Sequence, residues 1–182
     1  VIAGMARAIA DKRARHRIVL RSTMLPGSTL GLVKEFLHDL MEVGMVEVFY
    51  FPEFLREGTA VRDFEHPALT VVGTADGLAP SEEMSPLFGA NPCVVGWNEA
   101  ELVKYGCNTF HALKLTFANE IGRLSRALGL NSLAVMDILC RDTKLNISPA
   151  YMRPGNPFGG SCLPKDVRAL TDCARRNGIS LP

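Results

Sequence analysis

The sequence predicts an α/β N-terminal part with a partial parallel sheet, followed by an all-α part that opens with one long helix. Two observations support this fold class. Up to Gly96, short β-type runs alternate with segments of helical spacing, whereas after Gly96 apolar residues recur only at helical spacing. Alternating strands and helices are typical of a parallel sheet with helices on its faces. We therefore expect a boundary near residues 96 to 98, which gives domains 1–96 and 97–182.

The individual elements follow from apolar spacing and from the glycines and prolines that interrupt it. In the α/β part we expect helices at residues 1–14, 28–40 and 76–88, and strands at residues 17–23, 46–50, 69–72 and 93–95. In the α part we expect helices at residues 98–128, 133–141 and 164–177. The first of these would be about 45 Å long, which suits a connector or a dimer-forming helix, and its apolar content predicts that it is largely buried.

Composition and charge exclude several classes of function. The chain of 182 residues has a net charge of +1 and no long basic run, so we expect neither nucleic acid nor an anionic membrane surface as a partner. No uninterrupted apolar run reaches the ~18 residues of a membrane span. The five cysteines form no C-x-x-C pair, which favours reduced thiols and a cytoplasmic location. The histidines lack metal-site spacing, so we expect no metal.

Residues 159–166 (GGSCLPKD) place two glycines before Cys162 and a proline, Lys165 and Asp166 after it. Proline suits the first turn of a helix, so Cys162 is expected just outside a helix N-terminus. The helix dipole and the Lys165 charge would both favour the thiolate, which is the nucleophilic form. A small buried cysteine beside a tight turn explains the same pattern, so the residues alone leave both interpretations open.

One polar stripe runs along the expected long helix. Lys104, Asn108, His111 and Asn119 lie at spacings that bring them to one side of a helix. Polar groups buried on a helix need partners, and a ligand can supply them. A solvated face explains the stripe equally well.

The segment 145–156 is a polar loop ahead of the cysteine. It contains Tyr151, Arg153 and Asn156. Arginine is well suited to forked contacts with phosphate or carboxylate groups, although an ordinary surface loop can have the same composition.

Several of these segments resemble the nucleotide-sugar 6-dehydrogenases, the family of UDP-glucose and GDP-mannose dehydrogenases. The motifs that carry the resemblance are residues 52–58 (PEFLREG), 101–108 (ELVKYGCN), 117–120 (FANE) and 159–166 (GGSCLPKD). They occur in the same order as in the family and extend over essentially the whole chain. Within the family, residues 144–146 and 151–155 and the segment after Cys162 look most like the GDP-mannose 6-dehydrogenases of alginate biosynthesis.

The resemblance implies an oxidoreductase with a Rossmann-like NAD-binding part at residues 1–96 and a central helical dimerisation and catalytic domain at residues 97–182. The implied reaction is the four-electron oxidation of the C6 hydroxyl of a nucleotide sugar, GDP-mannose to GDP-mannuronate, with NAD. It would pass through a thiohemiacetal and a thioester on Cys162, and the protein would be a homodimer or a higher homo-oligomer through the long helix.

Residue roles come from the same motif match. The implied catalytic residues are Thr23, Glu53, Lys104, Asn108, Cys162 and Asp166. The implied sugar-nucleotide contacts are Glu57, His111, Asn119, Tyr151, Arg153, Asn156 and Gly159, and the implied NAD contacts are Thr23 and Lys165. Lys104 and Asn108 would stabilise an oxyanion, Asp166 with Thr23 would activate water, and Glu53 would transfer a proton.

The chain also departs from the family pattern. The opening G-x-G-x-x-G turn and the C-terminal nucleotide-binding domain are absent from the 182 residues, so we expect this polypeptide alone to be inactive. Phe51 stands where the family has Asn, and Ala150 where the GDP-mannose enzymes have an aromatic residue. Two alternatives follow: a UDP-glucose or other UDP-sugar 6-dehydrogenase, or, for this polypeptide alone, a non-catalytic helical assembly module.

Overall fold

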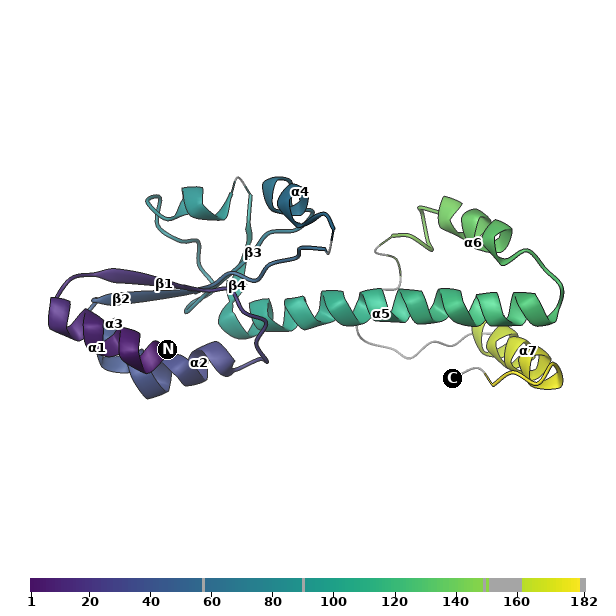
Figure 1. Cartoon of the computed structure of the whole chain (residues 1–182), viewed down its shortest axis with the longest axis horizontal. Coiled ribbons are helices and arrows are strands. Elements are labelled where there is room, and N and C mark those ends of the chain that lie inside the picture. The colour runs from purple at the N-terminus through teal and green to yellow at the C-terminus, as the bar shows by residue number, and fades with distance from the viewer. Residues whose placement is uncertain (57, 90, 149, 151–161, 181–182) are drawn as a thin grey trace. The chain divides into compact units, whose positions relative to one another are not determined.

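The computed structural model describes residues 1–56, 58–89, 91–148, 150 and 162–180 (Figure 1). The chain divides into two compact units, Val1–Thr109 and Phe110–Pro182. The domain boundary expected near residues 96 to 98 stays a prediction, because the two units are defined by contacts in space and need not coincide with the domains.

A four-stranded sheet forms the centre of the first unit. Its strands lie in the order β1 (His16–Leu20), β2 (Val46–Tyr50), β3 (Val71–Thr74) and β4 (Cys93–Gly96). β1 runs parallel to β2 and β3 runs parallel to β4, but β3 meets β2 in antiparallel orientation, with Tyr50 opposite Gly73. The predicted fold class, an α/β part followed by helices, is confirmed. The expected parallel sheet is wrong in one respect, because the sheet is mixed.

The connection between β2 and β3 explains the antiparallel pair. Two neighbouring parallel strands need a crossover connection that returns the chain to the end of the sheet where the first strand began. This connection usually contains a helix that runs the length of the strands. The only regular element described between these strands is the short helix α4 (Ala60–Glu65). A helix of six residues is only about 9 Å long. β3 therefore starts near the end of the sheet where β2 finishes, and it runs in the opposite direction.

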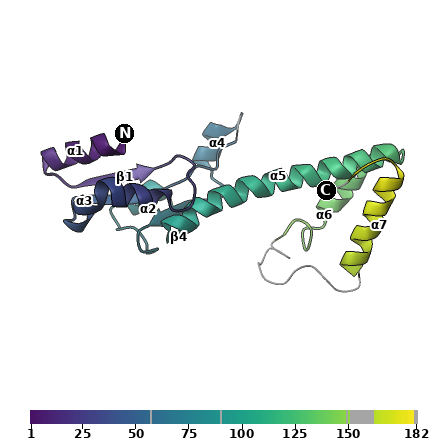
Figure 2. The same cartoon turned by 90° about the horizontal axis from the view of Figure 1, so that it is seen from below.

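Three helical segments cover one face of the sheet. These are α1 (Ile2–Lys12), α2 (Ser28–Leu32) and α3 (His38–Glu42), with the π-helical turn η1 (Val33–Leu37) joining the last two. Figures 1 and 2 show them beside β1 and β2. Since strand side chains alternate between faces, Ile18, Val48 and Tyr50 point to these helices and pack with Ile9 and Leu37.

A smaller apolar cluster covers the other face of the sheet. Phe49 and Val72 pack there against Met84 and Phe88, with Val19 and Phe51 beside them. The helix expected at residues 76–88 is wrong: this segment contains only the 3₁₀ turn η2 (Ser85–Phe88). Gly77 adopts a positive φ of 74°, and the Asp76 carboxylate accepts a hydrogen bond from the Leu78 N–H, so a turn replaces the first part of the helix.

The helices of the C-terminal half lie close to their predicted bounds. They are α5 (Trp97–Ala127), α6 (Ser132–Arg141) and α7 (Cys162–Arg176). α5 ends where Gly129 takes a φ of 68° and the Leu130 N–H bonds to the Ser125 carbonyl, a glycine-based C-cap. Asn131 then caps α6 by accepting a hydrogen bond from the Ala134 N–H.

The middle of α5 is exposed in the single chain, so the expectation of a largely buried helix is wrong. Leu113 and Leu115 are 63% and 67% exposed, and Phe117 is 47% exposed. Apolar spacing indicates which side chains can be buried, but burial also needs a neighbour, and the described part of one chain supplies none along this stretch. In the same described residues, none of the helices is both apolar and long enough to cross a membrane.

Candidate active site

A buried lysine and a glutamate, 51 residues apart in the chain, form the centre of the candidate site in the first unit. Lys104 on α5 is only 5% exposed. Its ammonium donates hydrogen bonds to the main-chain carbonyl of Glu53 and to Glu53 Oε1, the latter at 3.3 Å. It also lies 5.2 Å from the centre of the Phe54 ring, so a cation–π contact adds to its compensation.

Glu53 reaches this position because it follows β2 directly. Pro52 interrupts the ladder after the strand, and the Glu53 Oε2 atom accepts a hydrogen bond of 2.8 Å from the Leu55 N–H. Burial raises the pKa of Glu53, but the Leu55 N–H and the Lys104 ammonium outweigh it, so the pKa lies below the ordinary 4.5. At neutral pH, Glu53 is therefore a carboxylate that can accept a proton.

The loop after Glu53 is closed by an arginine–carboxylate pair. Asp63 on α4 accepts hydrogen bonds from the Arg56 main-chain N–H at 3.0 Å and from its guanidinium at 2.9 and 2.7 Å. The Thr59 hydroxyl donates a further bond of 2.9 Å to the same carboxylate. The Arg56 guanidinium holds the pKa of Asp63 far below its usual range. These bonds connect Arg56 to Thr59 and Asp63 at the start of α4.

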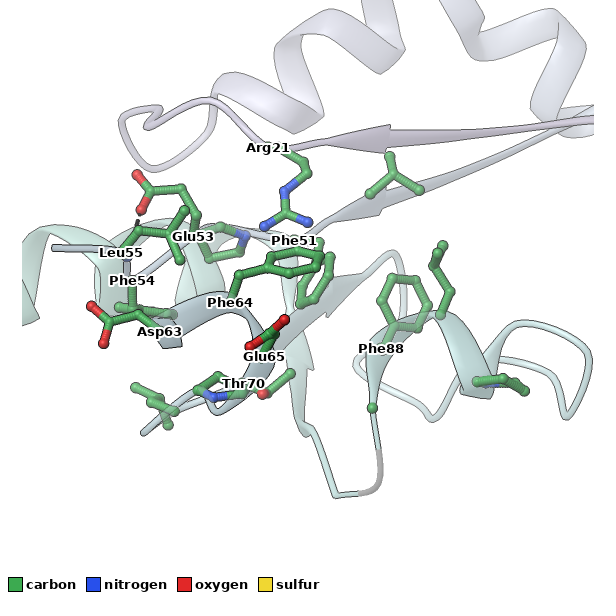
Figure 3. A pocket seen from close by; sticks show the side chains of 17 residues that line it. Arg21, Phe51, Glu53, Phe54, Leu55, Asp63, Phe64, Glu65, Thr70 and Phe88 are labelled. Atoms are coloured by element: carbon green, nitrogen blue, oxygen red, sulfur yellow. Dashed lines mark hydrogen bonds between the residues drawn. The ribbon is translucent and has the colours of Figure 1, made fainter. Parts of the chain in front are cut away.

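A cavity of about 480 Å³ opens between this loop and the sheet (Figure 3). Most of its wall is apolar, and Phe51, Phe64 and Phe88 contribute aromatic rings. The Arg21 guanidinium lies 4.5 Å from the centre of the Phe51 ring and 6.0 Å from that of Phe64. Phe51, where the family has Asn, thus provides a surface on which Arg21 stacks.

Thr23 lies in the same unit, just beyond β1. Its side chain is exposed, and no hydrogen bond between described residues uses its hydroxyl. Among those residues, no hydrogen bond joins it to Glu53 or Lys104. Since ligands of α/β sheets gather at the carboxyl ends of the strands, an exposed hydroxyl at this edge is accessible to a cofactor.

Three of the predicted site residues, Cys162, Lys165 and Asp166, belong to the second unit. Cys162 is exposed and is the first residue of α7, so it lies inside the helix rather than just outside it. Lys165 Nζ lies 2.6 Å from Asp166 Oδ1 on the same helical turn, and both side chains are exposed. A helix beginning at the cysteine keeps the thiol at the positive end of the dipole.

The remaining members of the polar stripe are accessible to solvent. Asn108, His111 and Asn119 are all exposed, in contrast to Lys104. Asn119 also lines a groove of about 590 Å³ in the second unit, together with Arg123 and Arg126. Five predicted contacts, Glu57, Tyr151, Arg153, Asn156 and Gly159, lie outside the described residues.

Three residues that matter locally were missed by the sequence reasoning: Arg21, Asp63 and Glu101. Asp63 and Arg21 gave no signal, because the sequence does not show how the segment after β2 folds, and that segment supplies their partners. Glu101 did give a signal in the sequence. It precedes Lys104 by about one helical turn and lies on the apolar side of the helix, where a charged residue is unusual. Within the described residues, no group of three His, Cys, Asp or Glu side chains could hold a metal ion.

Comparison with known families accounts for both halves of the chain. Residues 1–89 match the NAD binding domain of the UDP-glucose/GDP-mannose dehydrogenase family, and residues 98–182 match the central domain of the same family. The chain belongs to this dehydrogenase family. The α/β part is accordingly a Rossmann-like NAD-binding domain, as the resemblance implied.

Relatives with a named activity support the same assignment. The chain is 45% identical to the GDP-mannose 6-dehydrogenase of Pseudomonas savastanoi pv. phaseolicola, over 96% of the chain and 41% of the relative. Among solved structures, GDP-mannose dehydrogenase from Pseudomonas aeruginosa is similar with a TM-score of 0.87 and 41% identity, covering 98% of this chain and 42% of that one. A UDP-glucose dehydrogenase from Pyrobaculum islandicum is similar with a TM-score of 0.67 and 34% identity, covering 98% and 41%. The chain thus spans about two fifths of the length of these dehydrogenases.

The pair of Glu53 and Lys104 leads to a prediction about stability and pH. Replacing Glu53 by Gln removes the charge that compensates a buried ammonium, so we expect the free energy of unfolding at pH 7 to fall by about 1 kcal/mol. Because the folded-state pKa of Glu53 is depressed, its contribution is present above 4.5 and is lost as the pH falls through the lower folded-state value. Urea unfolding at several pH values measures this difference.

The control for this measurement is Glu65→Gln, which removes a carboxylate from an exposed position beside the same cavity. We expect it to be neutral. A Glu53→Gln variant that is as stable as the wild type at pH 7, or whose deficit persists unchanged at pH 3, would contradict the interpretation of the pair.

Proposed function

We propose that the complete protein containing this chain oxidises the C6 hydroxyl of a nucleotide sugar to a carboxylate with NAD, and that its substrate is GDP-mannose. The observation that carries the proposal is the buried Lys104 ammonium held by Glu53, since it supplies a fixed cation and an ionised base at one place. The choice of sugar rests on 45% identity to a GDP-mannose 6-dehydrogenase against 35% to the UDP-glucose 6-dehydrogenase of Haloferax volcanii.

Lys104 can hold a developing oxyanion without leaving Glu53. An ammonium has three donors, and two of them are used by the Glu53 carbonyl and carboxylate. The third is available to an oxygen on the substrate. A cation that is already fixed and largely removed from water stabilises charge in a transition state at little reorganisation cost. Asn108, one turn further along α5, would donate the second hydrogen bond.

Cys162 would supply the covalent step. Its thiolate adds to the C6 aldehyde carbon, which forms a C–S bond and gives a thiohemiacetal; loss of hydride from C6 then leaves a thioester. Water attacks the thioester carbon, the C–S bond breaks, and the carboxylate and the thiol are released. Bound NAD⁺ supplies the hydride-accepting chemistry, once for the alcohol and once for the thiohemiacetal.

The remaining residues would move protons and orient water. Glu53 is ionised at neutral pH and can take the proton of the C6 hydroxyl. Asp166, one turn after the cysteine, would orient the hydrolytic water with Thr23. The exposed Thr23 hydroxyl at the carboxyl end of β1 and the exposed Lys165 ammonium on α7 are accessible for the NAD contacts that we assign to them from the motif resemblance.

We assign substrate recognition to residues of the polar stripe on α5 and of the loops. The residues that would contact the sugar nucleotide are Glu57, His111, Asn119, Tyr151, Arg153, Asn156 and Gly159. The exposure of His111 and Asn119 supports a role in binding rather than in packing. A UDP-sugar is the alternative substrate, and for the 182-residue polypeptide alone the alternative is an assembly module without catalysis.

An assay of the complete protein with NAD⁺ separates these possibilities. We expect NADH and uronic acid in a 2:1 ratio with GDP-mannose. We expect a kcat/KM at least about 100-fold lower with UDP-glucose, because protein groups that hydrogen-bond to guanine would be left unpaired by uracil. Cys162→Ser should bind GDP-mannose but make no acid, whereas Cys173→Ser, on the same helix, should be unaffected.

Preference for UDP-glucose would overturn the choice of sugar. Normal acid formation by Cys162→Ser would overturn the thioester mechanism. The absence of NADH formation by the complete protein with either nucleotide sugar would overturn the proposed oxidation. NADH formation by the 182-residue polypeptide alone would overturn the assembly module as its alternative.

We also propose that the protein is a cytoplasmic homodimer or higher homo-oligomer through α5. Phe110, Leu113 and Phe117 share one face of this helix and are 38%, 63% and 47% exposed, which is a large apolar surface to leave in water. Leu113→Glu should therefore shift the mass measured by light scattering towards the monomer, and Ala112→Glu, on a different face, should not. A monomeric wild-type protein would contradict this assembly.

A further inference from the structure

Glu101 is a charged side chain that is removed from water completely. It lies on the second turn of α5 and is 0% exposed. Burial of a carboxylate is costly unless hydrogen bonds compensate it. Three donors do so: the Gly27 N–H reaches Oε2 at 2.7 Å, while the Thr29 N–H and hydroxyl reach Oε1 at 2.7 and 2.6 Å.

These donors belong to the start of α2, more than seventy residues earlier in the chain. The first N–H groups of a helix have no partner within the helix, and a side chain at the N-cap usually accepts from them. Here the N-cap residue is Gly27, which has a φ of 92° and no side chain to offer. The Glu101 carboxylate, which lies on α5, caps α2 in place of an N-cap side chain. Its negative charge suits the positive end of the helix dipole.

The turn of α5 that carries Glu101 is itself fixed to the sheet. The Trp97 ring N–H donates to the Val48 carbonyl at 3.2 Å, and Trp97 and Ala100 are both buried. A Cβ added to Gly73 on β3 would lie 2.9 Å from the Ala100 Cβ, so strand and helix are already in close contact. Glu101 therefore joins the start of α2 to a rigid support.

The connection matters because of what lies at each end. Residues 21–27 link β1 to α2 and include Thr23, and Glu101 holds the far end of this loop. Lys104 follows Glu101 by one turn on the same helix and holds Glu53 after β2. Two consecutive contacts on one buried helix face thus fix the loops that follow two neighbouring parallel strands.

We propose that Glu101 is a positioning residue, which sets the loop carrying Thr23 in register with the Lys104 and Glu53 pair. The expected effect on kinetics rests on the proposed function, whereas the expected effect on the loop rests on the geometry alone. It assigns Glu101 no contact with the substrate or with NAD. Loss of the carboxylate leaves the loop attached to β1 but free to shift at its other end.

The test is Glu101→Gln in the complete protein, with hydrogen exchange and steady-state kinetics as readouts. Gln keeps the shape but presents an NH₂ group to one of the N–H donors. We expect amide exchange in residues 22–29 to quicken about tenfold or more, while β2 keeps its protection. The kcat should fall about 10- to 100-fold, with the KM for the nucleotide sugar within about threefold, because a displaced catalytic loop costs turnover rather than substrate affinity.

Two further variants make the result decisive. Glu99→Gln removes a charge from an exposed position on the same helix end and should change neither readout. Thr29→Val removes only the hydroxyl bond to Glu101 and should give the same pattern more weakly, which keeps the test valid if Glu101→Gln fails to fold.

The outcomes separate this inference from the proposed function. Unchanged exchange at residues 22–29, or a lower melting temperature with normal kcat per folded molecule, would overturn the positioning role. A wild-type protein that oxidises no nucleotide sugar would overturn the proposed function, and the exchange measurement would still decide whether Glu101 holds the loop.

Discussion

The structure of the candidate site depends on one constraint: the charge of Lys104, a residue that is only 5% exposed, must be compensated by the protein. Lys104 meets it through the carbonyl and carboxylate of Glu53, so the end of β2 cannot move independently of α5. The Leu55 N–H and the Arg56–Asp63 pair then fix the rest of the loop. A buried pair of this kind adds little net stability, because desolvation offsets the attraction. Its effect is to specify the geometry of a cation and a base.

The first turns of α5 serve as a common support for several parts of the site. Four buried residues lie on one face of this helix: Trp97, Ala100, Glu101 and Lys104. Trp97 and Ala100 contact the sheet, Glu101 holds the start of α2, and Lys104 holds the loop after β2. Further along, the same helix exposes polar and apolar side chains alike. One helix thus changes from a buried structural support to an exposed surface.

The sequence predicted much of this arrangement, and the exceptions have physical causes. Helix α5 and strand β2 were predicted within a residue of their bounds, because long proline-free spacing and a compact β-type run leave few alternatives. The helix expected at residues 76–88 failed since turn chemistry at Asp76 and Gly77 outweighed apolar spacing. Motif resemblance named Glu53 and Lys104, but only the fold shows that they form a pair. The role of Glu101 was not predicted, because two of its three donors are main-chain N–H groups of a turn more than seventy residues away, and the sequence does not show that the fold brings them to this carboxylate.

We propose that Lys104 acts on the reacting oxygen while Glu53 holds it in place. The most direct test is the kcat of Lys104→Met in the complete protein, compared with Lys114→Met, which removes a lysine that lies beside Phe110 on the same helix. We expect Lys104→Met to lower kcat about 10²- to 10³-fold with little change in KM, as for the loss of other fixed oxyanion donors, and Lys114→Met to have no effect. Equal kcat values for the two variants would contradict the account.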